Sequence, residues 1–415
     1  MSDSQGDPFP RHDTFRIENK RLAADRPSSN LATRPADLGH LIGGCGIAGC
    51  ISIRGDRISG ESITTMLTTM SERENGLGAG YACYGLFPDR RDEFCLQFLF
   101  DNEHSKCLTE EFLKEYSEVR KDERVFTKKV PTLAPPYPLV WRYFIRPSDK
   151  REWRGNSNLS EEDYVIRMVM HINKSIEGTY CVSSGRDMAI FKGNGYSFEV
   201  SEFYDIGRYS GQLWISHSRF PTNSPGWWGG AHPIGILDWA VCHNGEITSY
   251  GVNRKLVEMA GYECTLLTDT EVIAYMFDLL VRKHELPIPA AAFAMAPWHH
   301  SEILRMDPDS RLLANALRLT YKEAFLNGPF SIIVGRREPQ ITMIALADRK
   351  KLRPLIVGRS KDNKMVYSAS EECAIRSVDT EAEAWTPNAG SPMIAQVGKG
   401  VIRAGIEPPF WGVVQ

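Results

Sequence analysis

The chain has 415 residues, 42% of them hydrophobic and 10% aromatic, so it can bury one large core or two ordinary ones. Its formal net charge of −3 at pH 7 argues against a general nucleic-acid or anionic-membrane binder. No apolar run approaches the roughly 18 residues of a membrane span, and the N-terminus has no apolar signal core. The nine scattered cysteines contain no Cys-x-x-Cys pair, which favours reduced thiols, a cytoplasmic location and no metal site.

Residues 1–44 differ in composition from the rest of the chain. They are polar, charged and punctuated by prolines, which predicts a flexible leader or propeptide. The apolar run at 45–53 predicts a buried strand, and apolar residues at helical spacing predict a helix over 61–73. The glycine-rich stretch 73–80 is expected to be a loop that lets the backbone approach the first strand.

The next part of the chain has the weakest pattern. Residues 101–160 are predicted to be an insertion, because four prolines between Pro131 and Pro138 indicate a linker or surface excursion. A capping pattern at Ser160 predicts a helix that runs to about Ile176. The stretch 188–200 predicts a hairpin that turns at Gly-Asn-Gly.

Strands return in the second half of the chain. Two are predicted at 212–216 and 236–242, on either side of a Pro/Gly/Trp-rich loop, and Thr268 with Glu271 predicts a capping box for a helix. Further strands are predicted at 330–334, 341–345, 355–357 and 365–368. Strands therefore dominate both ends and helices cluster between them, as in an α+β protein.

Cys45 is the candidate catalytic nucleophile, and it becomes the N-terminus if residues 1–44 are removed. A thiol with a pKa of about 8.5 is mostly protonated at pH 7, and an N-terminal cysteine carries its own base, an α-amine with a pKa of about 7.7–8.0. Gly43 and Gly44 make the preceding bond sterically open to cleavage. Taken alone, the run Cys-Gly-Ile-Ala-Gly is more typical of a buried strand. Three later stretches favour the nucleophile.

Asn244 and Gly245 can stabilise the negative charge that develops when an amide is attacked. The asparagine offers a side-chain amide and the glycine an unobstructed backbone N–H, and such donors are worth about 3–4 kcal/mol each in other acyl-transfer enzymes. The alternative is a hairpin turn, for which Asn-Gly is the strongest short signal. A tight turn can also hold two donors rigidly, so the two interpretations are compatible.

Arg219 and Asp269 suit the α-groups of a free glutamine. A guanidinium binds a carboxylate through two parallel hydrogen bonds, and a carboxylate binds an α-ammonium. The alternatives are a surface cation for Arg219 and, for Asp269, a first-turn helix carboxylate that interacts with the helix dipole.

As a set and in this order, these segments resemble the class II glutamine amidotransferases, the N-terminal-nucleophile group. The family's opening Cys-Gly-Ile-x-Gly is matched at residues 45–49, its oxyanion-hole Asn-Gly at 244–245, and its Ser/Thr-Asp-Ser/Thr-Glu at 268–271. The resemblance extends from Cys45 to about Ile402. It implies that Cys45 is the nucleophile, that Asn244 and Gly245 form the oxyanion hole, and that glutamine is held by Arg219, Thr222 and Asp269.

The resemblance also implies a fold and a partner. The fold is a four-layer αββα sandwich with two mainly antiparallel sheets, over a domain at 45–405 that is followed by a tail at 406–415. The long gap between Cys45 and Arg219, together with the Trp-Trp-Gly-Gly run at 227–230, is most similar to stand-alone glutamate-synthase-type subunits. No cofactor is expected in this chain. FMN, and an iron–sulfur centre in some such enzymes, are expected on a flavin-dependent synthase subunit that accepts the ammonia in a hetero-oligomer.

Three further interpretations stay open on the sequence. The loop at 225–230 can be a closing element with glycine hinges or an aromatic plug over the sheet edge. The chain can be an N-terminal-nucleophile amidase for another amide, although Arg219 and Asp269 fit a free amino acid better. It can also be a glutamine-sensing or scaffold subunit that keeps the pocket without the cleavage.

Overall fold

The computed structural model describes residues 44–408, except for 154, 157, 220–225 and 267. Most of the predicted leader and of the predicted C-terminal tail therefore lies outside the described residues, as does Thr222.

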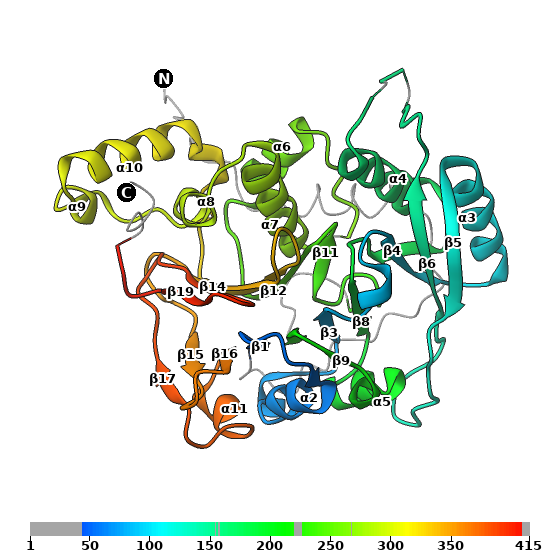
Figure 1. The fold of residues 1–415 in the computed structure, drawn as a ribbon, viewed down its shortest axis with the longest axis horizontal. Helices are drawn as coiled ribbons and strands as arrows, with labels where there is room; N and C mark the ends of the chain where they lie inside the picture. The colour runs from blue at the N-terminus through cyan, green and yellow to red at the C-terminus, as the bar shows by residue number, and fades with distance from the viewer. Residues whose placement is uncertain (1–43, 154, 157, 220–225, 267, 409–415) are drawn as a thin grey trace, which may run out of the picture.

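The first of two central sheets contains the strand that follows Cys45 (Figure 1). Its strands are β1 (Gly46–Ser52), β3 (Ala79–Tyr84), β8 (Met188–Gly193), β10 (Leu213–Ser218), β15 (Ile356–Arg359), β16 (Met365–Ala369) and β17 (Glu383–Trp385). Their order is β17-β15-β16-β1-β10-β3-β8, so β1 is the central strand of seven. A short pair, β2 (Ile58–Ser59) with β9 (Ser210–Gly211), lies beside this sheet.

The second central sheet is built from the later part of the chain. Its strands are β11 (Ile234–Ile236), β12 (Trp239–Gly245), β13 (Phe330–Arg336), β14 (Thr342–Ala347), β18 (Met393–Gln396) and β19 (Gly400–Ala404). They follow one another across the sheet in chain order. The strand pairs within both sheets are antiparallel.

The two sheets pack face to face around an apolar core. Ile47 and Ile215 of the first sheet belong to the same buried cluster as Ile333 and Met343 of the second. The sheets approach closely at Gly49, because a Cβ there would sit 3.0 Å from the Met343 sulfur and 3.1 Å from Ile333. The hydrophobic effect drives this burial but gives it no direction, so it sets the spacing of the sheets rather than their exact alignment.

Helices cover the outer faces of both sheets. The first sheet is covered by α2 (Gly60–Thr68), α5 (Ser197–Tyr204) and α11 (Glu372–Arg376). The second is covered by α6 (Tyr250–Met259) and α7 (Asp269–Phe277), with a π-helical continuation at Asp278–Lys283. A further group, α8 (Ile288–Met295), α9 (His300–Ile303) and α10 (Pro308–Thr320), extends to one side (Figure 1). The predicted four-layer αββα sandwich is confirmed.

Residues 101–160 are more ordered than the sequence predicted. A separate four-stranded antiparallel sheet has the order β5-β6-β4-β7. Its strands are β4 (Phe94–Phe100), β5 (Ser117–Arg124), β6 (Leu139–Pro147) and β7 (Thr179–Ser183), and α3 (Glu103–Tyr116) and α4 (Glu161–Ser175) accompany them. Only the proline-rich stretch between β5 and β6 is the predicted excursion.

The hairpin predicted at 188–200 is wrong. The strand β8 ends at Gly193 and the chain continues into α5. The first residue of that helix is held from a distance, because the carboxylate of Glu74 accepts hydrogen bonds from the backbone N–H (2.8 Å) and the hydroxyl (2.7 Å) of Ser197. The Gly-Asn-Gly sequence that predicted a turn gives no indication of this contact with Glu74, which is distant in sequence.

Within the described part of the chain, we find no helix with the length and apolarity needed to cross a membrane.

Candidate functional site

The register of the first sheet brings Cys45 to Arg219. Gly46, the first residue of β1, pairs with Ser218, the last residue of β10. Cys45 precedes Gly46 and Arg219 follows Ser218, so both lie at the same end of these two neighbouring strands. Arg219 is buried, and burial lowers the pKa of its guanidinium to about 10, against the opposing electrostatic effect of Cys45 and Asp269. Arg219 therefore stays a cation at neutral pH and lies within electrostatic range of both residues.

The main chain at Cys45 is held by a second arginine. Arg73 donates from Nε to the carbonyl oxygen of Cys45 (3.2 Å), and its Nη1 pairs with Glu371 at 2.7 Å. Cys45 itself is half-buried. The loop at 73–80 thus reaches the first strand through the side chain of Arg73, and its backbone approaches the neighbouring strand, where the Arg219 N–H donates to the Gly78 carbonyl at 2.8 Å.

Ser370 links the start of β1 to Asn244, the buried residue near the end of β12. Its hydroxyl oxygen accepts from the Ile47 backbone N–H at 3.1 Å and lies 3.5 Å from Nδ2 of Asn244. The Ser370 backbone N–H donates in return to the Ile47 carbonyl (2.9 Å). The sequence analysis assigned no role to this residue. The available signal was the Ala-Ser-Glu run at 369–371, directly after the predicted strand 365–368.

The Asn-Gly pair at 244–245 is not a hairpin turn. Gly245 is the last residue of β12 and pairs with Phe330, and the chain between them forms several helices before β13 returns. Its φ of +132° is a conformation that side chains rarely adopt, and a Cβ would sit 2.0 Å from the carbonyl oxygen of Pro329. Glycine is therefore required here by both backbone geometry and space.

Asp269 is the first residue of α7, as its alternative interpretation predicted. Its Oδ2 accepts from the Ile247 backbone N–H at 3.0 Å, and its Oδ1 lies 3.3 Å from Nδ1 of His243. Burial would raise the pKa of the carboxyl, but the charge and hydrogen bond of His243 and the Ile247 N–H lower it below its usual value. Asp269 is thus an anion with a side chain that is 25% exposed.

The capping box predicted at 268–271 forms only in part. Thr268 is the N-cap, and its hydroxyl accepts from the Thr270 N–H. The carboxylate of Glu271 does not complete the box. It accepts instead from the N–H groups of Thr265 (2.9 Å) and Leu266 (2.8 Å), in the segment that leads into the helix.

Buried histidines connect the two sheets beneath these residues. Nε2 of His217, on β10, donates to the backbone carbonyl of His243, on β12, at 3.0 Å. The rings of His217 and His232 lie 4.2 Å apart, and Nε2 of His232 lies 3.2 Å from the Thr268 hydroxyl. Burial lowers the pKa of His217 and of His232 well below the usual value, so both rings are neutral. These contacts also went unpredicted.

The Trp-Trp-Gly-Gly run is a packed plug in the part that the structure describes, residues 226–230. Trp227 and Trp228 are buried, the first against Tyr180 (4.8 Å between ring centres) and the second against Phe203 (5.3 Å). A Cβ on either following glycine would lie within 2.3 Å of the Trp227 ring, so these glycines serve close packing. The prediction of a hinged closing element is wrong for this stretch, and Pro225 lies outside the described residues.

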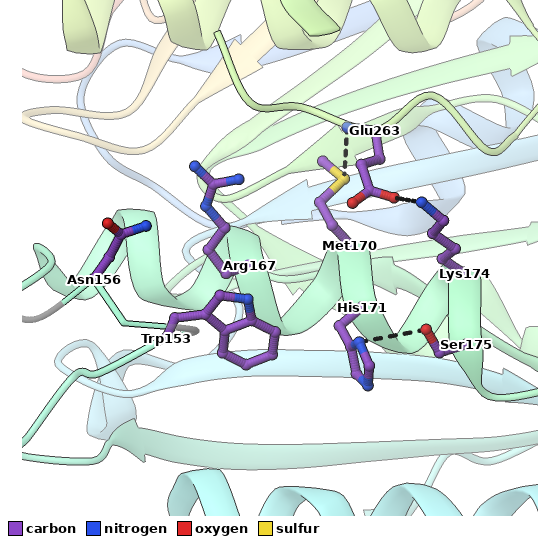
Figure 2. Close-up of a pocket in the computed structure, with 8 residues that line it drawn as sticks. All are labelled: Trp153, Asn156, Arg167, Met170, His171, Lys174, Ser175 and Glu263. Carbon is purple, nitrogen blue, oxygen red and sulfur yellow. Dashed lines mark hydrogen bonds and ion pairs between the residues drawn. The ribbon is translucent and has the colours of Figure 1, made fainter. Parts of the chain in front are cut away.

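A surface pocket of about 210 Å³ lies over α4, away from this site (Figure 2). The charged groups in its lining are already paired, since Lys174 contacts Glu263 at 2.8 Å and Arg167 donates to the carbonyl of Gly261 at 3.0 Å. The residues that the sequence predicts for amide chemistry are not among those that line it. We therefore place the candidate site around Cys45, at the end of the neighbouring strands β1 and β10.

Comparison with known proteins identifies the family of the chain. The family model for class-II glutamine amidotransferases matches residues 109–384, more than half of the chain; the matched segment contains Arg219, Asn244 and Asp269 and begins after Cys45. A protein of Archaeoglobus fulgidus, described only as uncharacterized, is 43% identical over 359 residues, which cover 85% of this chain and 92% of that protein.

Two more distant relatives carry functional names. A protein of Methanothermobacter thermautotrophicus named as a glutamine amidotransferase is 27% identical over 346 residues, covering 82% of this chain and 95% of that protein. Among solved structures, the glutamine phosphoribosylpyrophosphate amidotransferase of B. subtilis is 14% identical with a TM-score of 0.42, covering 86% of this chain and 48% of that one. The family-model match shows that the chain belongs to the class II glutamine amidotransferases, a family of enzymes.

One buried amine next to the site should make the free energy of unfolding depend on pH. Nζ of Lys192 donates to the carbonyls of Gly229 (2.8 Å) and Pro233 (3.4 Å), and burial lowers the pKa of this amine to about 7, against the opposing charge of Glu271. In the unfolded chain the pKa is about 10.4, so between these values only the unfolded state binds the proton.

We therefore expect this residue to make the free energy of unfolding rise with pH between 7 and 9, by up to about 1.4 kcal/mol per pH unit. The contribution is full above the unfolded-state pKa and is lost as the pH falls toward 7. Denaturant unfolding of the wild type and of Lys192→Met at pH 7, 8 and 9 measures the difference in slope. Parallel pH profiles for the two proteins would show that the amine is not neutral in the folded state.

Proposed function

We propose that the chain hydrolyses L-glutamine to glutamate and ammonia through a thioester on Cys45. The observation that supports the proposal is the pairing of Gly46 with Ser218, because the flanking residues, Cys45 and the buried Arg219, leave neighbouring strands at the same end. The electrostatic coupling of Arg219 to both Cys45 and Asp269 supports one compact site.

In the proposed reaction, the α-amine of Cys45, exposed once residues 1–44 are removed, takes the thiol proton. The sulfur attacks the side-chain amide carbon of glutamine, and the carbonyl π electrons move to oxygen. The amine then gives its proton to the leaving nitrogen, the carbon–nitrogen bond breaks, and ammonia departs from a thioester. Water then attacks the thioester carbon and gives a proton to the amine, the carbon–sulfur bond breaks, the amine returns that proton to the sulfur, and glutamate leaves the restored thiol.

The remaining residues supply charge stabilisation and binding in this proposal. Nδ2 of Asn244 and the Gly245 N–H donate to the oxyanion, and Ser370 positions the Asn244 amide relative to the start of β1. Arg219 binds the α-carboxylate and Asp269 the α-ammonium of the substrate. We keep Thr222 as a further carboxylate contact on the strength of its sequence position alone.

Replacing Cys45 by Ala should abolish glutamine hydrolysis without unfolding the protein, because a small side chain fits at a strand start. Cys50 is the matched control: it lies on the same strand, it is fully buried, and burial raises the pKa of its thiol to about 12, so it stays protonated and unreactive. We expect Cys50→Ala to keep most of the activity in a glutamate-release assay. Equal losses in the two variants would mean that the nucleophile is misassigned.

Arg219→Lys and Asn244→Ala should separate binding from chemistry. The lysine replaces a bidentate fork by a point charge, so KM for glutamine should rise strongly with kcat less affected. Loss of the Asn244 donor should lower kcat by about 10²–10³, since that donor acts on charge present only in the transition state. Steady-state kinetics on both variants measures this split. An unchanged kcat for Asn244→Ala would remove it from the oxyanion hole.

We further propose that the ammonia passes to a flavin-binding synthase subunit of a glutamate-synthase-like complex. The support is the sequence resemblance: the long segment between Cys45 and Arg219 and the Trp-Trp-Gly-Gly run are similar to stand-alone subunits of that type. The isolated chain should hydrolyse glutamine slowly, and co-purification from the native host should yield a flavoprotein that stimulates it. Full activity of the chain alone, with no flavoprotein bound, would contradict the coupled-subunit proposal and leave the glutaminase proposal intact.

A further inference from the structure

The side chain of His243 lies against the carboxylate proposed to bind the substrate ammonium. Its Nδ1 is 3.3 Å from Oδ1 of Asp269 and 3.1 Å from the hydroxyl of Thr270. The histidine is buried, on β12, one residue before Asn244. One strand therefore presents both the proposed oxyanion donor and a group that contacts the proposed ammonium binder.

We propose that His243 is a positioning residue that orients Asp269 and thereby sets the preference for substrates that carry an α-ammonium. The inference rests on the proposed function of Asp269 and adds a specificity determinant to it. His243 has no direct role in the bond-breaking steps described above.

The hydrogen-bonding directions at this contact follow from the chemistry of the groups. An ionised carboxylate only accepts hydrogen bonds, so the contact with Oδ1 requires the proton on Nδ1 of His243. The Thr270 hydroxyl, 3.4 Å from Oδ1, is a second donor to the same oxygen, and the Ile247 N–H donates to Oδ2 at 3.0 Å. Both oxygens are therefore held by donors from the protein, while the Asp269 side chain stays 25% exposed.

The backbone of His243 is fixed as well. Its carbonyl accepts from Nε2 of His217 on the other sheet, and its register on β12 is set by pairing with Ile332. The Nδ1 donor thus belongs to a rigid strand, whereas Asp269 lies at the start of a helix and depends on its neighbours for orientation. A hydrogen bond to a charged group in a buried site is among the stronger ones available to a protein.

Removal of the Nδ1 donor should therefore weaken recognition of the ammonium selectively. His243→Leu removes the donor and keeps apolar volume, and His243→Asn keeps an N–H near the position of Nδ1. The matched control is His232→Asn, another buried histidine that contacts His217 and Thr268 and does not contact the Asp269 carboxylate.

The readout is the ratio of kcat/KM for L-glutamine to that for 4-carbamoylbutanoate, which has the same amide and carboxylate but no α-ammonium. We expect His243→Leu to lower this ratio by about 10- to 100-fold, mainly through KM for glutamine, as loss of a charge-assisted hydrogen bond implies. His243→Asn should stay within about threefold of the wild type, and His232→Asn should leave the ratio unchanged. If His243→Leu does not fold, His243→Gln, whose amide lies nearer the position of Nε2, takes its place.

A binding measurement separates this inference from the glutaminase proposal. Calorimetric titration of the same proteins with L-glutamate and with glutarate reports recognition of the ammonium without turnover. An unchanged preference for L-glutamate in the folded His243 variant would overturn the positioning role, whether or not the wild type hydrolyses glutamine. A wild type that discriminates between these ligands without hydrolysing glutamine would overturn only the glutaminase proposal. If the wild type binds both ligands with equal affinity, or binds neither of them, Asp269 does not recognise the ammonium. The positioning role proposed for His243 would then be overturned as well.

Discussion

The candidate site depends on a hydrogen bond that crosses between the two sheets, from His217 on β10 to the backbone carbonyl of His243 on β12. Apolar contacts hold the sheets together elsewhere, but they have no direction and tolerate small displacements. A buried hydrogen bond does not tolerate such displacements, because loss of the His217 donor would leave the His243 carbonyl desolvated and unpaired. Arg219 follows β10 and Asn244 follows His243, so this one contact fixes the spacing between groups that are distant in sequence.

The residues proposed for catalysis and binding come from both sheets, which the hydrogen bond between His217 and His243 connects. The first sheet provides Cys45 and Arg219 at the ends of neighbouring antiparallel strands. The second provides Asn244 and Gly245 at the end of β12, with Asp269 at the start of the helix that covers it. Ser370 adds a further link between the sheets at the start of β1. The buried rings of His217 and His232 are neutral, so they add no charge beneath the site.

The sequence predicted the features that depend on local pattern. The strands around Cys45 and His217, the helix after Thr268 and the layered α+β class follow from hydrophobic periodicity, capping residues and the family resemblance. The failures lie where a partner is distant in sequence. Glu74 starts α5 in place of the hairpin predicted after Gly193, and the extended segments around the proline-rich stretch pair into a sheet of their own. Ser370 and His243 acquire their contacts only in the folded chain, through residues that are distant in sequence: Ser370 contacts Ile47 and Asn244, and His243 contacts Asp269 and Thr270.

The central claim is that Cys45 attacks a glutamine held by Arg219 and Asp269. The most direct measurement is intact and peptide mass spectrometry of the protein from its native host after incubation with a diazoketone analogue of L-glutamine, which alkylates a nucleophile placed at the side-chain carbonyl. The account predicts a chain that begins at Cys45 and carries one adduct on that residue, with labelling suppressed by excess L-glutamine. An adduct on another residue, or an unlabelled chain that retains residues 1–44, would contradict it.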